Sequence, residues 1–559
     1  MSQTHWRILP QVPLRTNLPG IHPLVVQLLY NRGITEPSQI EAFLSIDQRL
    51  KTDPFLLPDM HRAVQRVYQA LLRGEKIAVY GDFDADGVTA TAVLVLGLSA
   101  LGGRVVPFIP HRYRDGYGLQ LAPLERLSRE GVSLVITADT GITAFEEVAR
   151  CHKLGMDVIV TDHHVPPDYL PPAFAVVDPK RDDSRFTAID LAGVGVAFKL
   201  LEALMRGSGR DKLLNDLLDL VALGTVADMV LLLGDNRYWV RRGLDLLNNT
   251  QRIGLQEMMR CAGLQPGNLT SENIAWVLAP RINAAGRMDD ASASYRLLVT
   301  RSQEEAVRLA RDLEEKNARR QKMTVELLSR AREQLLVQGT DMPLLMTGGT
   351  DYPAGVMGLV AGRLTEEFYR PVILLRVGSD VCRGSGRSIP EFNLIKALDR
   401  CRDLLLNAGG HAGAAGFTVQ RSQLGALQAR LLKIAEEELA GVDLRPHIDI
   451  DAEVSLDVFS GDVYRQIQRL APFGSGNPEP TFVSREVEVI ERSLAGEQGD
   501  HLRLKLRQRG VIWDTIGFGL GSLASQVGSR LDIAYNLIAD NWNGVERLRL
   551  KLLDFDPVD

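Results

Sequence analysis

Three aspartates spaced two residues apart mark the part of the chain best suited to chemistry. Asp82, Asp84 and Asp86 lie in Gly81-Asp-Phe-Asp-Ala-Asp-Gly87, directly after the apolar run Ile77–Tyr80. Carboxylates this close together repel one another unless cations hold them. The segment therefore indicates a metal site with oxygen ligands at the end of a buried strand.

The same spacing also occurs in EF-hand calcium loops and in solvated acidic turns. An EF-hand loop begins D-x-D-x-D-G, but it needs a glutamate at loop position twelve and a helix in front. Here Val93 occupies that position and a strand pattern precedes the loop, which argues against an EF-hand. A solvated acidic turn stays open for this stretch taken alone.

Further carboxylates and two imidazoles follow later apolar runs. An isolated aspartate at a strand end often caps the next helix, and an isolated buried histidine is usually hydrogen-bonded core. Converging on one crevice, however, these groups would form an oxygen-rich site suited to Mn²⁺ or Mg²⁺ rather than to structural zinc. The residues in question are Asp139, Asp162, His163, His164, Asp178 and Asp228.

The elements that must position these side chains alternate between strand and helix. Short apolar runs separated by helical patterns predict a doubly wound parallel sheet, whose ligand site lies at the carboxyl ends of its strands. The runs are Ile77–Tyr80, Val105–Ile109, Leu134–Thr137, Val158–Thr161 and Ala175–Val177.

Composition sets broad limits. The 559 residues predict three or four domains, and 45% hydrophobic with 24% charged residues is typical of globular proteins. A net charge of −6 means that any nucleic-acid site must be a local basic patch. Four scattered cysteines without a C-x-x-C pair, and no signal or membrane-spanning pattern, predict a reduced cytoplasmic protein without a membrane partner.

Three features follow the sheet domain. Ser302–Val337 is a helical pattern whose middle is polar all round, so it bridges two bodies or faces a ligand, with a solvated face as the alternative. Gly384–Ser388 and Gly409–His411 are expected to be glycine-rich loops, in which Arg387 could bind a phosphate.

The last feature is a set of period-two runs from Thr481 onward, which predicts a small β-barrel. One strand alternates basic residues, and three aromatic residues could stack on bases, although barrel aromatics are usually core. These residues are His501, Arg503, Lys505, Arg507, Trp513, Phe518 and Trp542.

The motifs resemble those of the DHH phosphoesterase superfamily, named for an Asp-His-His such as Asp162–His164 here. The resemblance continues into the RecJ branch, the single-strand-specific 5′→3′ DNA exonucleases, and covers residues 75 to 559. It is carried further by Ala279-Pro-Arg-Ile-Asn-Ala-Ala-Gly-Arg287, Gly384-Ser-Gly-Arg-Ser388, Gly409-Gly-His-Ala-Gly-Ala-Ala-Gly416 and Leu470-Ala-Pro-Phe-Gly-Ser-Gly-Asn-Pro-Glu-Pro480.

The resemblance implies roles by position. Metal ligands would be Asp82, Asp84, Asp86, Asp139, His163 and Asp228, holding two Mn²⁺ or Mg²⁺ ions. His164 would face the substrate phosphate or assist catalysis, and Asp162 would orient the imidazoles. Contacts to phosphate or DNA would come from Arg112, Arg281, Asn283, Arg287, Asn317, Arg320, Gln321, Ser385, Gly386, Arg387 and His411.

The implied architecture is α/β. It consists of an N-terminal extension (1–75), a DHH domain with a doubly wound parallel sheet (76–300), a long linking helix (301–337), a smaller α/β DHH-associated domain (338–442) and an OB-fold barrel (443–559). One departure is Tyr352-Pro353, where RecJ-like sequences usually have Trp-His, which puts recognition of the strand end in doubt.

The resulting hypothesis is metal-dependent hydrolysis of single-stranded DNA from its 5′ end to mononucleotides, in recombination and repair. The alternatives are a DHH phosphodiesterase acting on dinucleotides or short oligonucleotides, a catalytically dead relative, and a non-catalytic single-strand-binding protein. A single-strand-binding protein and a helicase are expected partners, and the protein is expected to be a monomer.

Overall fold

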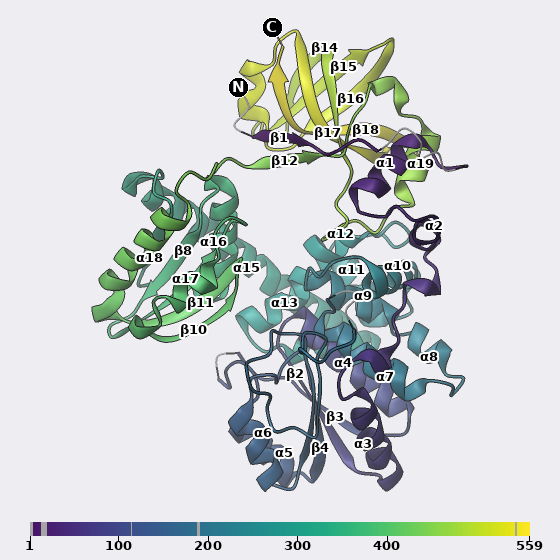
Figure 1. Ribbon diagram of the computed structural model, residues 1–559, viewed down its shortest axis with the longest axis vertical. Helices are drawn as coiled ribbons and strands as arrows, with labels where there is room; N and C mark the ends of the chain where they lie inside the picture. Colours follow the sequence, from purple (N-terminus) through teal and green to yellow (C-terminus); the bar gives the residue numbers. More distant parts are fainter. Residues whose placement is uncertain (1–3, 13–18, 113, 187–189, 543–544, 559) are drawn as a thin grey trace. The chain divides into compact units, whose positions relative to one another are not determined.

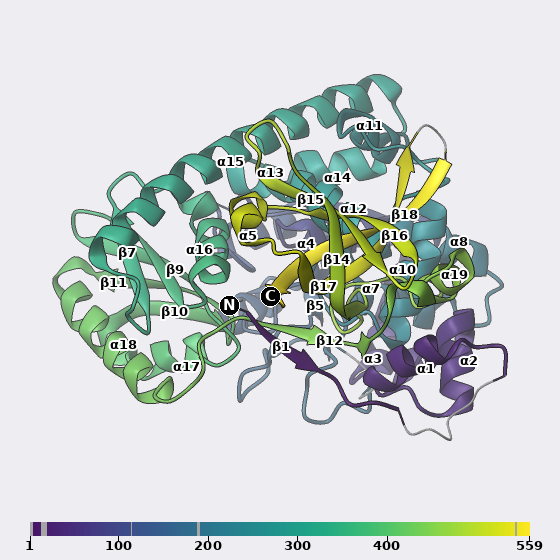
Figure 2. The same ribbon diagram turned by 90° about the horizontal axis from the view of Figure 1, so that it is seen from above.

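The computed structural model describes residues 4–12, 19–112, 114–186, 190–542 and 545–558. These form two compact units, Met1–Leu313 with His447–Asp559, and Glu314–Pro446. The division falls inside α15 (Gln303–Gln338), which is a single continuous helix (Figure 2), as the pattern over Ser302–Val337 predicts. None of the helices described is both long and apolar enough to cross a bilayer.

The first unit contains the predicted parallel sheet (Figure 1). Its five strands are all parallel and lie in the order β3-β2-β4-β5-β6. They are β2 (Lys76–Gly81), β3 (Arg104–Phe108), β4 (Val132–Ala138), β5 (Asp157–Thr161) and β6 (Ala175–Val177).

Helices cover both faces of this sheet, which confirms the doubly wound fold. Because side chains alternate along a strand, Ile77 and Val79 pack on one face and Ala78 and Tyr80 on the other. The first face is covered by α3 (Met60–Arg73), α4 (Ala85–Ala100), α7 (Gly193–Met205) and α9 (Leu218–Ala227), and the second by α5 (Leu121–Arg129) and α6 (Phe145–Lys153).

A further group of helices completes this domain. They are α8 (Asp211–Asn215), α10 (Gly234–Leu247), α11 (Ile253–Cys261), α12 (Ser271–Asn273), the π-helical turn η3 (Ile274–Leu278), α13 (Ala279–Met288) and α14 (Ser292–Val299).

The C-terminal strands form the predicted barrel. The order β14-β15-β16-β18-β17 closes because β17 also pairs with β14, and β13 adds to the edge of β14. The elements are β12 (His447–Ile450), β13 (Ala452–Glu453), α19 (Gly461–Gln468), β14 (Thr481–Ala495), β15 (His501–Gln508), β16 (Val511–Gly517), β17 (Arg530–Trp542) and β18 (Val545–Pro557).

The N-terminal residues are shared between two cores. Leu28 and Phe43 pack into the barrel core with Phe482 and Tyr535, whereas α3 packs on the parallel sheet. The segments on the barrel side are β1 (His5–Ile8), which pairs with β12, α1 (Pro23–Asn31) and α2 (Pro37–Ser45). Among the described residues before β2, β1, α1 and α2 thus lie against the barrel and α3 against the parallel sheet.

The second unit is a mixed sheet in the order β10-β11-β9-β8-β7, with helices on both faces. Its strands are β7 (Leu345–Gly349), β8 (Val372–Val377), β9 (Val381–Arg387), β10 (Leu405–His411) and β11 (Ala414–Gln420). Its helices, besides the second half of α15, are α16 (Ala354–Phe368), α17 (Leu394–Asp399) and α18 (Leu424–Glu438).

The expectation of glycine-rich loops in this unit is wrong. Gly384–Arg387 lies in β9 and Gly409–His411 in β10, both paired with β11. A Cβ added to Gly384 would stand 2.2 Å from the ring of Phe417. The glycine is therefore needed to admit a neighbouring side chain within the sheet, not to form a turn.

Candidate metal centre

The ends of three parallel strands bring the predicted ligands together. Asp82 follows β2, Asp139 follows β4 and Asp162-His163-His164 follows β5, while Asp228 ends α9. Three sets of ligand atoms each lie within 4.8 Å of one another: Asp139 with His163 and His164, Asp86 with His163 and Asp228, and Asp82 with Asp84 and Asp139.

Asp84 and Asp86 make different hydrogen bonds at the start of α4. Asp84 is its N-cap, and its Oδ1 accepts hydrogen bonds from the backbone N–H groups of Asp86 and Gly87, both at 3.0 Å. Asp86 is buried, and its carboxylate accepts the N–H groups of Gly193 at 2.6 Å and Val194 at 2.8 Å.

Gly193 and Val194 hold the carboxylate of Asp86 through their backbone N–H groups, a contact that the sequence did not predict. They begin α7, so the partial positive charge of a helix N-terminus faces the carboxylate of Asp86. Gly193-Val-Gly195 lacks the third glycine and the acidic residue of a dinucleotide-binding motif, so the pattern predicted no function. A glycine at the start of a helix was the only local feature that could have drawn attention to this position. Nothing in the sequence indicated that its N–H donates to Asp86.

Asp139 has a backbone that L-residues rarely adopt, with φ of 63°. The chain opposite it leaves no spare room, because a Cβ added to Gly193 would stand 2.4 Å from the Cβ of Asp139. Gly193 therefore contributes in two ways. Its lack of a side chain permits the close approach to Asp139, and its backbone N–H donates to Asp86. Backbone strain of this kind persists only where surrounding contacts fix it, and it is often found at functional sites.

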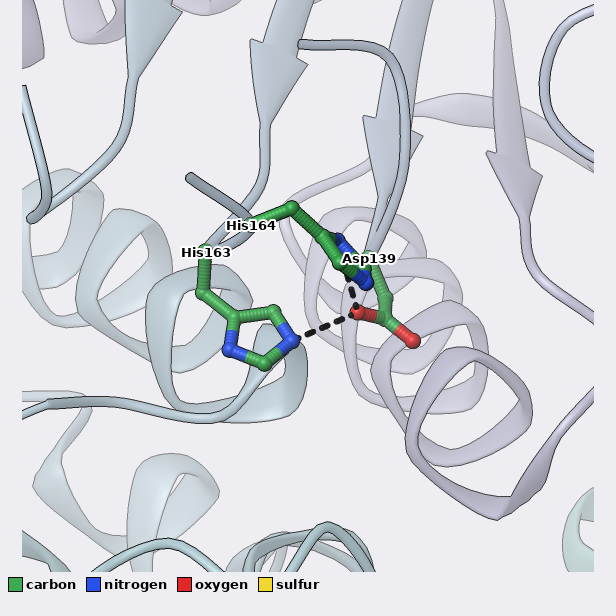
Figure 3. A group of neighbouring side chains, drawn as sticks. All are labelled: Asp139, His163 and His164. Atoms are coloured by element: carbon green, nitrogen blue, oxygen red, sulfur yellow. Dashed lines mark ion pairs between the residues drawn. The ribbon is translucent and has the colours of Figure 1, made fainter. Parts of the chain in front are cut away.

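The imidazoles of His163 and His164 both point toward the carboxylate of Asp139 (Figure 3). His163 Nε2 lies 3.0 Å from Asp139 Oδ1, and its Nδ1 lies 3.7 Å from Asp228 Oδ2. His164 Nδ1 lies 2.7 Å from Asp162 Oδ1. The other oxygen of Asp162 accepts the N–H of Ile142 at 2.9 Å, which supports the predicted orienting role of Asp162.

Burial makes the metal-free carboxylates resist ionisation. It raises the pKa of Asp86 to about 7 and that of Asp228 to about 9, and neighbouring carboxylates add to both shifts. The pKa values of Asp82 and Asp139 are raised well above the usual range, again by burial first and by the charge of nearby aspartates second. A bound cation would stabilise the ionised carboxylates and so lower these pKa values.

The two histidines shift in opposite directions. Burial, with the charge of His164, lowers the pKa of His163 to about 3, which keeps it neutral and able to bind a metal. Burial also disfavours the charged form of His164, but its hydrogen bond to Asp162 and the surrounding carboxylates raise its pKa to about 9. His164 and Asp162 therefore form an ion pair.

The donor atoms fit divalent cations. Asp82 Oδ1 and His163 Nδ1 are buried and have no hydrogen-bond partner among the residues that the structure describes. Buried polar atoms without partners are costly in a native protein unless a ligand satisfies them. Several carboxylates with one neutral imidazole suit Mn²⁺ or Mg²⁺.

Four of the predicted DNA-contacting residues lie in the same unit as the metal centre. Arg112 stacks over Phe83 in the triple-aspartate segment, with 5.0 Å from guanidinium to ring centre. Arg281, Asn283 and Arg287 lie on α13. The side-chain carbonyl of Asn283 accepts the N–H of Ala85 at 2.8 Å, so this residue supports the first turn of α4.

In the second unit the sheet gathers another predicted group. Arg387 in β9 and His411 in β10 both align with Ala414 of β11, and Ser385 lies on the same face as Arg387. A Cβ added to Gly358 of α16 would stand 2.9 Å from Arg387 Nη2 and 3.2 Å from Ser385 Oγ. Gly386 lies between them and its carbonyl accepts a hydrogen bond from Arg387.

Arg387 is suited to an anion. Burial lowers its pKa, and no carboxylate lies within ion-pair distance of it across the described parts of the chain. A half-buried guanidinium without a counterion favours a phosphate or carboxylate ligand.

The remaining predicted residues are distributed elsewhere. Asn317, Arg320 and Gln321 lie on α15, and Asn317 is buried with no hydrogen-bond partner for its amide among the described residues. Tyr352, at the departure from the RecJ pattern, is fully buried and donates its hydroxyl hydrogen to Gln334 at 2.5 Å. This side chain packs in the core of the second unit.

On the barrel, basic residues alternate outward along β15 as predicted, but Lys505 and Arg507 pair with Glu491 and Glu488. Trp513 is half-buried and donates to the carbonyl of Leu456, so it is core. Phe518 is 56% exposed. The side chain of Trp542 lies outside the described residues.

Family models match the chain in three places. Residues 76–225 match the N-terminal domain of the DHH family, 337–439 match the DHHA1 domain and 450–554 match the RecJ OB domain. The single-stranded-DNA-specific exonuclease RecJ of Bacillus subtilis strain 168 is 36% identical over 538 residues, covering 96% of this chain and 68% of that protein.

Solved structures give the same result. The crystal structure of RecJ from Thermus thermophilus in complex with Mn²⁺ matches with a TM-score of 0.85 and 32% identity, over 100% of this chain and 80% of that one. The Mg²⁺ complex of RecJ from the same organism matches with a TM-score of 0.79 and 30% identity, over 100% and 79%.

Proposed function

The chain belongs to the RecJ family of DHH phosphoesterases, and from this membership we propose that it is a metal-dependent exonuclease that degrades single-stranded DNA from the 5′ end to mononucleotides. Such an activity serves DNA recombination and repair. The observation that carries the proposal is the cluster of carboxylates, of which Asp82, Asp86 and Asp139 are buried, with a neutral imidazole at the strand ends.

The residues divide into ligands and supporting groups. Asp82, Asp84, Asp86, Asp139, His163 and Asp228 would hold two divalent cations. Cations bound there supply the Lewis acidity that activates water and neutralises charge on the phosphate. The α7 N-terminus holds Asp86 in place, and Asp162 holds the protonated imidazole of His164. With its side chain 46% exposed, His164 can donate a proton or hydrogen bond to a phosphate oxygen.

Polarity would come from the second unit. Arg387, without a carboxylate partner, and Ser385 beside it are the proposed site for the terminal 5′-phosphate, with His411 on the same sheet. Arg112, Arg281, Arg287, Asn317, Arg320 and Gln321 are proposed as further contacts to the strand. The domain boundaries at 75, 300, 337 and 442 also stay part of this proposal.

A time course with Mn²⁺ on strands labelled at the 5′ or 3′ end tests the activity. We expect early release of labelled mononucleotide from the 5′-labelled strand and none after Asp139→Ala. Digestion from the 3′ end would contradict the polarity. Turnover of dinucleotides with no activity on longer strands would favour the small-substrate phosphodiesterase instead.

A second comparison tests the 5′-phosphate site. Arg387→Ala should raise KM for a 5′-phosphorylated strand by at least about tenfold and abolish its advantage over a 5′-hydroxyl strand, because a charged hydrogen-bonded contact is lost. Arg383→Ala, on an exposed position of the same strand, is the matched control. Equal loss with both variants would contradict a specific phosphate site.

Single-stranded DNA is the proposed ligand of the barrel, and exposed Arg503 and Phe518 are candidate contacts. Association with a single-strand-binding protein and a helicase, a monomeric state and a cytoplasmic location stay predictions.

A further inference from the structure

The loop that follows Asp228 needs external support. Its first residue, Met229, has φ of 61°, a left-handed conformation that is unfavourable for a non-glycine residue. Such a backbone persists only where surrounding contacts fix it. Met229 itself is 75% exposed, so its own side chain supplies little of that support.

Part of the support comes from a segment that leads into the barrel, Leu470–Pro480, which we call the clasp. The N–H of Leu232 donates to the carbonyl oxygen of Ser475 at 2.8 Å. From the other side, the side-chain amide of Asn236 donates to the carbonyl of Leu231 at 2.9 Å. Two successive residues of the loop are thereby held, one by the clasp and one by α10.

Two glycines of the clasp permit this close approach. Gly476 has φ of 71°, and a Cβ added there would stand 2.9 Å from Leu231 Cδ2. A Cβ added to Gly474 would stand 2.8 Å from Leu232 Cδ1. A side chain at either position would push against the loop that follows Asp228.

The clasp has a fixed shape of its own. Gly474 and Asn477 exchange backbone hydrogen bonds of 2.9 and 3.0 Å, which closes a tight turn. The buried amide of Asn477 donates to the carbonyls of Leu470 and Pro472, both at 2.8 Å, and accepts from Arg32 Nε at 2.7 Å. The turn is therefore held by contacts within the protein itself.

A buried arginine anchors the clasp to the helix beyond the loop. Arg237 of α10 is fully buried, and its Nη1 donates to the carbonyl of Leu470 at 2.7 Å. Its guanidinium stacks on the ring of Phe43 at 3.5 Å and also donates to the carbonyl of Phe43. Arg237 thus connects the clasp and α2 to α10, the helix that follows the loop.

We propose that the clasp is a positioning element of the metal centre. By fixing the backbone from Met229 to Leu232, it sets the direction in which the carboxylate of Asp228 faces His163 and Asp86. The proposal rests on the proposed role of Asp228 as a metal ligand. A segment at the entrance to the barrel would then affect the metal centre even when no DNA reaches the barrel.

Gly476→Val tests this most directly, and Ser475→Ala is the matched control because it retains the carbonyl that Leu232 uses. Calorimetric titration of the metal-free full-length chain with Mn²⁺ measures the metal site without relying on activity. We expect Gly476→Val to weaken Mn²⁺ binding at one site by about 10–100-fold, as is typical when the support of a metal ligand is lost. Ser475→Ala should bind as the wild type does.

Activity gives the second readout, on a strand too short to reach the barrel and on a long one. A positioning role predicts that Gly476→Val lowers kcat on both strands at limiting Mn²⁺ and recovers with excess Mn²⁺. If Gly476→Val does not fold by circular dichroism, Gly476→Ala, which adds only the Cβ, replaces it.

Unchanged Mn²⁺ affinity in a folded variant, or a defect confined to the long strand, would overturn the proposal. Absence of Mn²⁺ binding by the wild type would overturn it as well. A wild type that binds Mn²⁺ but does not degrade single strands would instead contradict the proposed function, and the titration would still decide the role of the clasp.

Discussion

The sheet domain contains two groups of charged side chains, largely buried, that differ in whether their charges balance. In the first, the lysine cluster of Lys51, Lys199, Glu202 and Asp235, two positive groups meet two negative ones. Lys199 Nζ lies 2.7 Å from Asp235 and 2.9 Å from Glu202, and Lys51 Nζ lies 2.6 Å from Glu202. Thr52 supplies its carbonyl to Lys199 and its N–H to Asp235.

In the second group, the metal centre, the charges do not balance. Asp82, Asp86 and Asp139 are as buried as Lys199, Glu202 and Asp235, yet the charged imidazole beside them, His164, is already paired with Asp162. Helix α7 serves both groups, with Lys199 in its interior and Gly193 at its start. Burial of charge alone is therefore no sign of function, whereas buried carboxylates without a compensating cationic side chain indicate a site for a cation.

The largest effect should come from Asp139→Asn. It keeps the shape but removes a ligand, so nuclease activity with Mn²⁺ should fall roughly a thousandfold or more, a loss of several kcal/mol of transition-state stabilisation. Metal-free stability should stay the same or rise, because one repelling carboxylate is gone. Activity assays and thermal melting in chelator measure the two effects.

Asp216→Asn, at an exposed position of the same domain, is the control and should change neither quantity. Strong destabilisation of metal-free Asp139→Asn would contradict the view that this carboxylate is uncompensated.

Lys199→Met should have the opposite effects, lowering stability while leaving nuclease activity nearly unchanged. It leaves Asp235 buried without its cation, which should lower the free energy of unfolding by about 3–5 kcal/mol. Activity per folded molecule should stay near the wild-type level at low temperature. Denaturant unfolding and a low-temperature assay test this pair of outcomes, and the double variant Lys199→Met with Asp235→Asn should recover part of the stability.

Mn²⁺ should separate the two groups by its effect on melting. At about 100 times its dissociation constant, it should stabilise the wild type by about 2.7 kcal/mol per site. Lys199→Met should gain as much, since its metal centre is intact, and Asp139→Asn should gain less. An equal gain in all three proteins would place the stabilising ion outside the metal centre.

The smallest effect concerns pH. The raised pKa values of Asp86, about 7, and Asp228, about 9, mean that the metal-free folded state keeps protons that the unfolded state has released above about pH 4. Their contribution to stability is therefore lost as pH rises through about 7 and about 9. Mn²⁺ must displace these protons, so its stabilising effect should grow from about pH 6 to about pH 8.

Melting with and without Mn²⁺ at both pH values measures this trend. The pH dependence should be shallower in Asp86→Asn, which has no proton to release. A stabilising effect of Mn²⁺ that does not change between these pH values would show that the carboxylates are already ionised without metal.

Most of the metal centre could be predicted from the sequence. Apolar runs ending in Asp82, Asp139 and Asp162 predict parallel strands, and parallel strands place their carboxyl ends at one edge. The period-two runs after Thr481 predicted the barrel in the same way, because alternation along a strand is a local property. The family motifs then specified the roles proposed for these residues.

Predictions failed where a residue's role depends on a distant partner. The glycines of Gly384–Arg387 favoured a loop, but the segment is part of a strand. Position 384 is a glycine because the ring of Phe417 occupies the space where a side chain would stand. For Trp513, base stacking and a core position were both open from the sequence, and the structure packs it against the barrel core, where it donates to the carbonyl of Leu456. Local patterns contain no information on which ring or carbonyl will lie opposite.

The sequence by itself determined the ligand types and the sheet edge that collects them, because both follow from short periodic patterns. Only the tertiary structure decided that the N-terminus of α7 holds Asp86 and that the clasp holds the loop after Asp228. Those contacts join residues more than a hundred positions apart, as Asp86 with Gly193 and Leu232 with Ser475. Packing of the whole unit, not local preference, brings such pairs together.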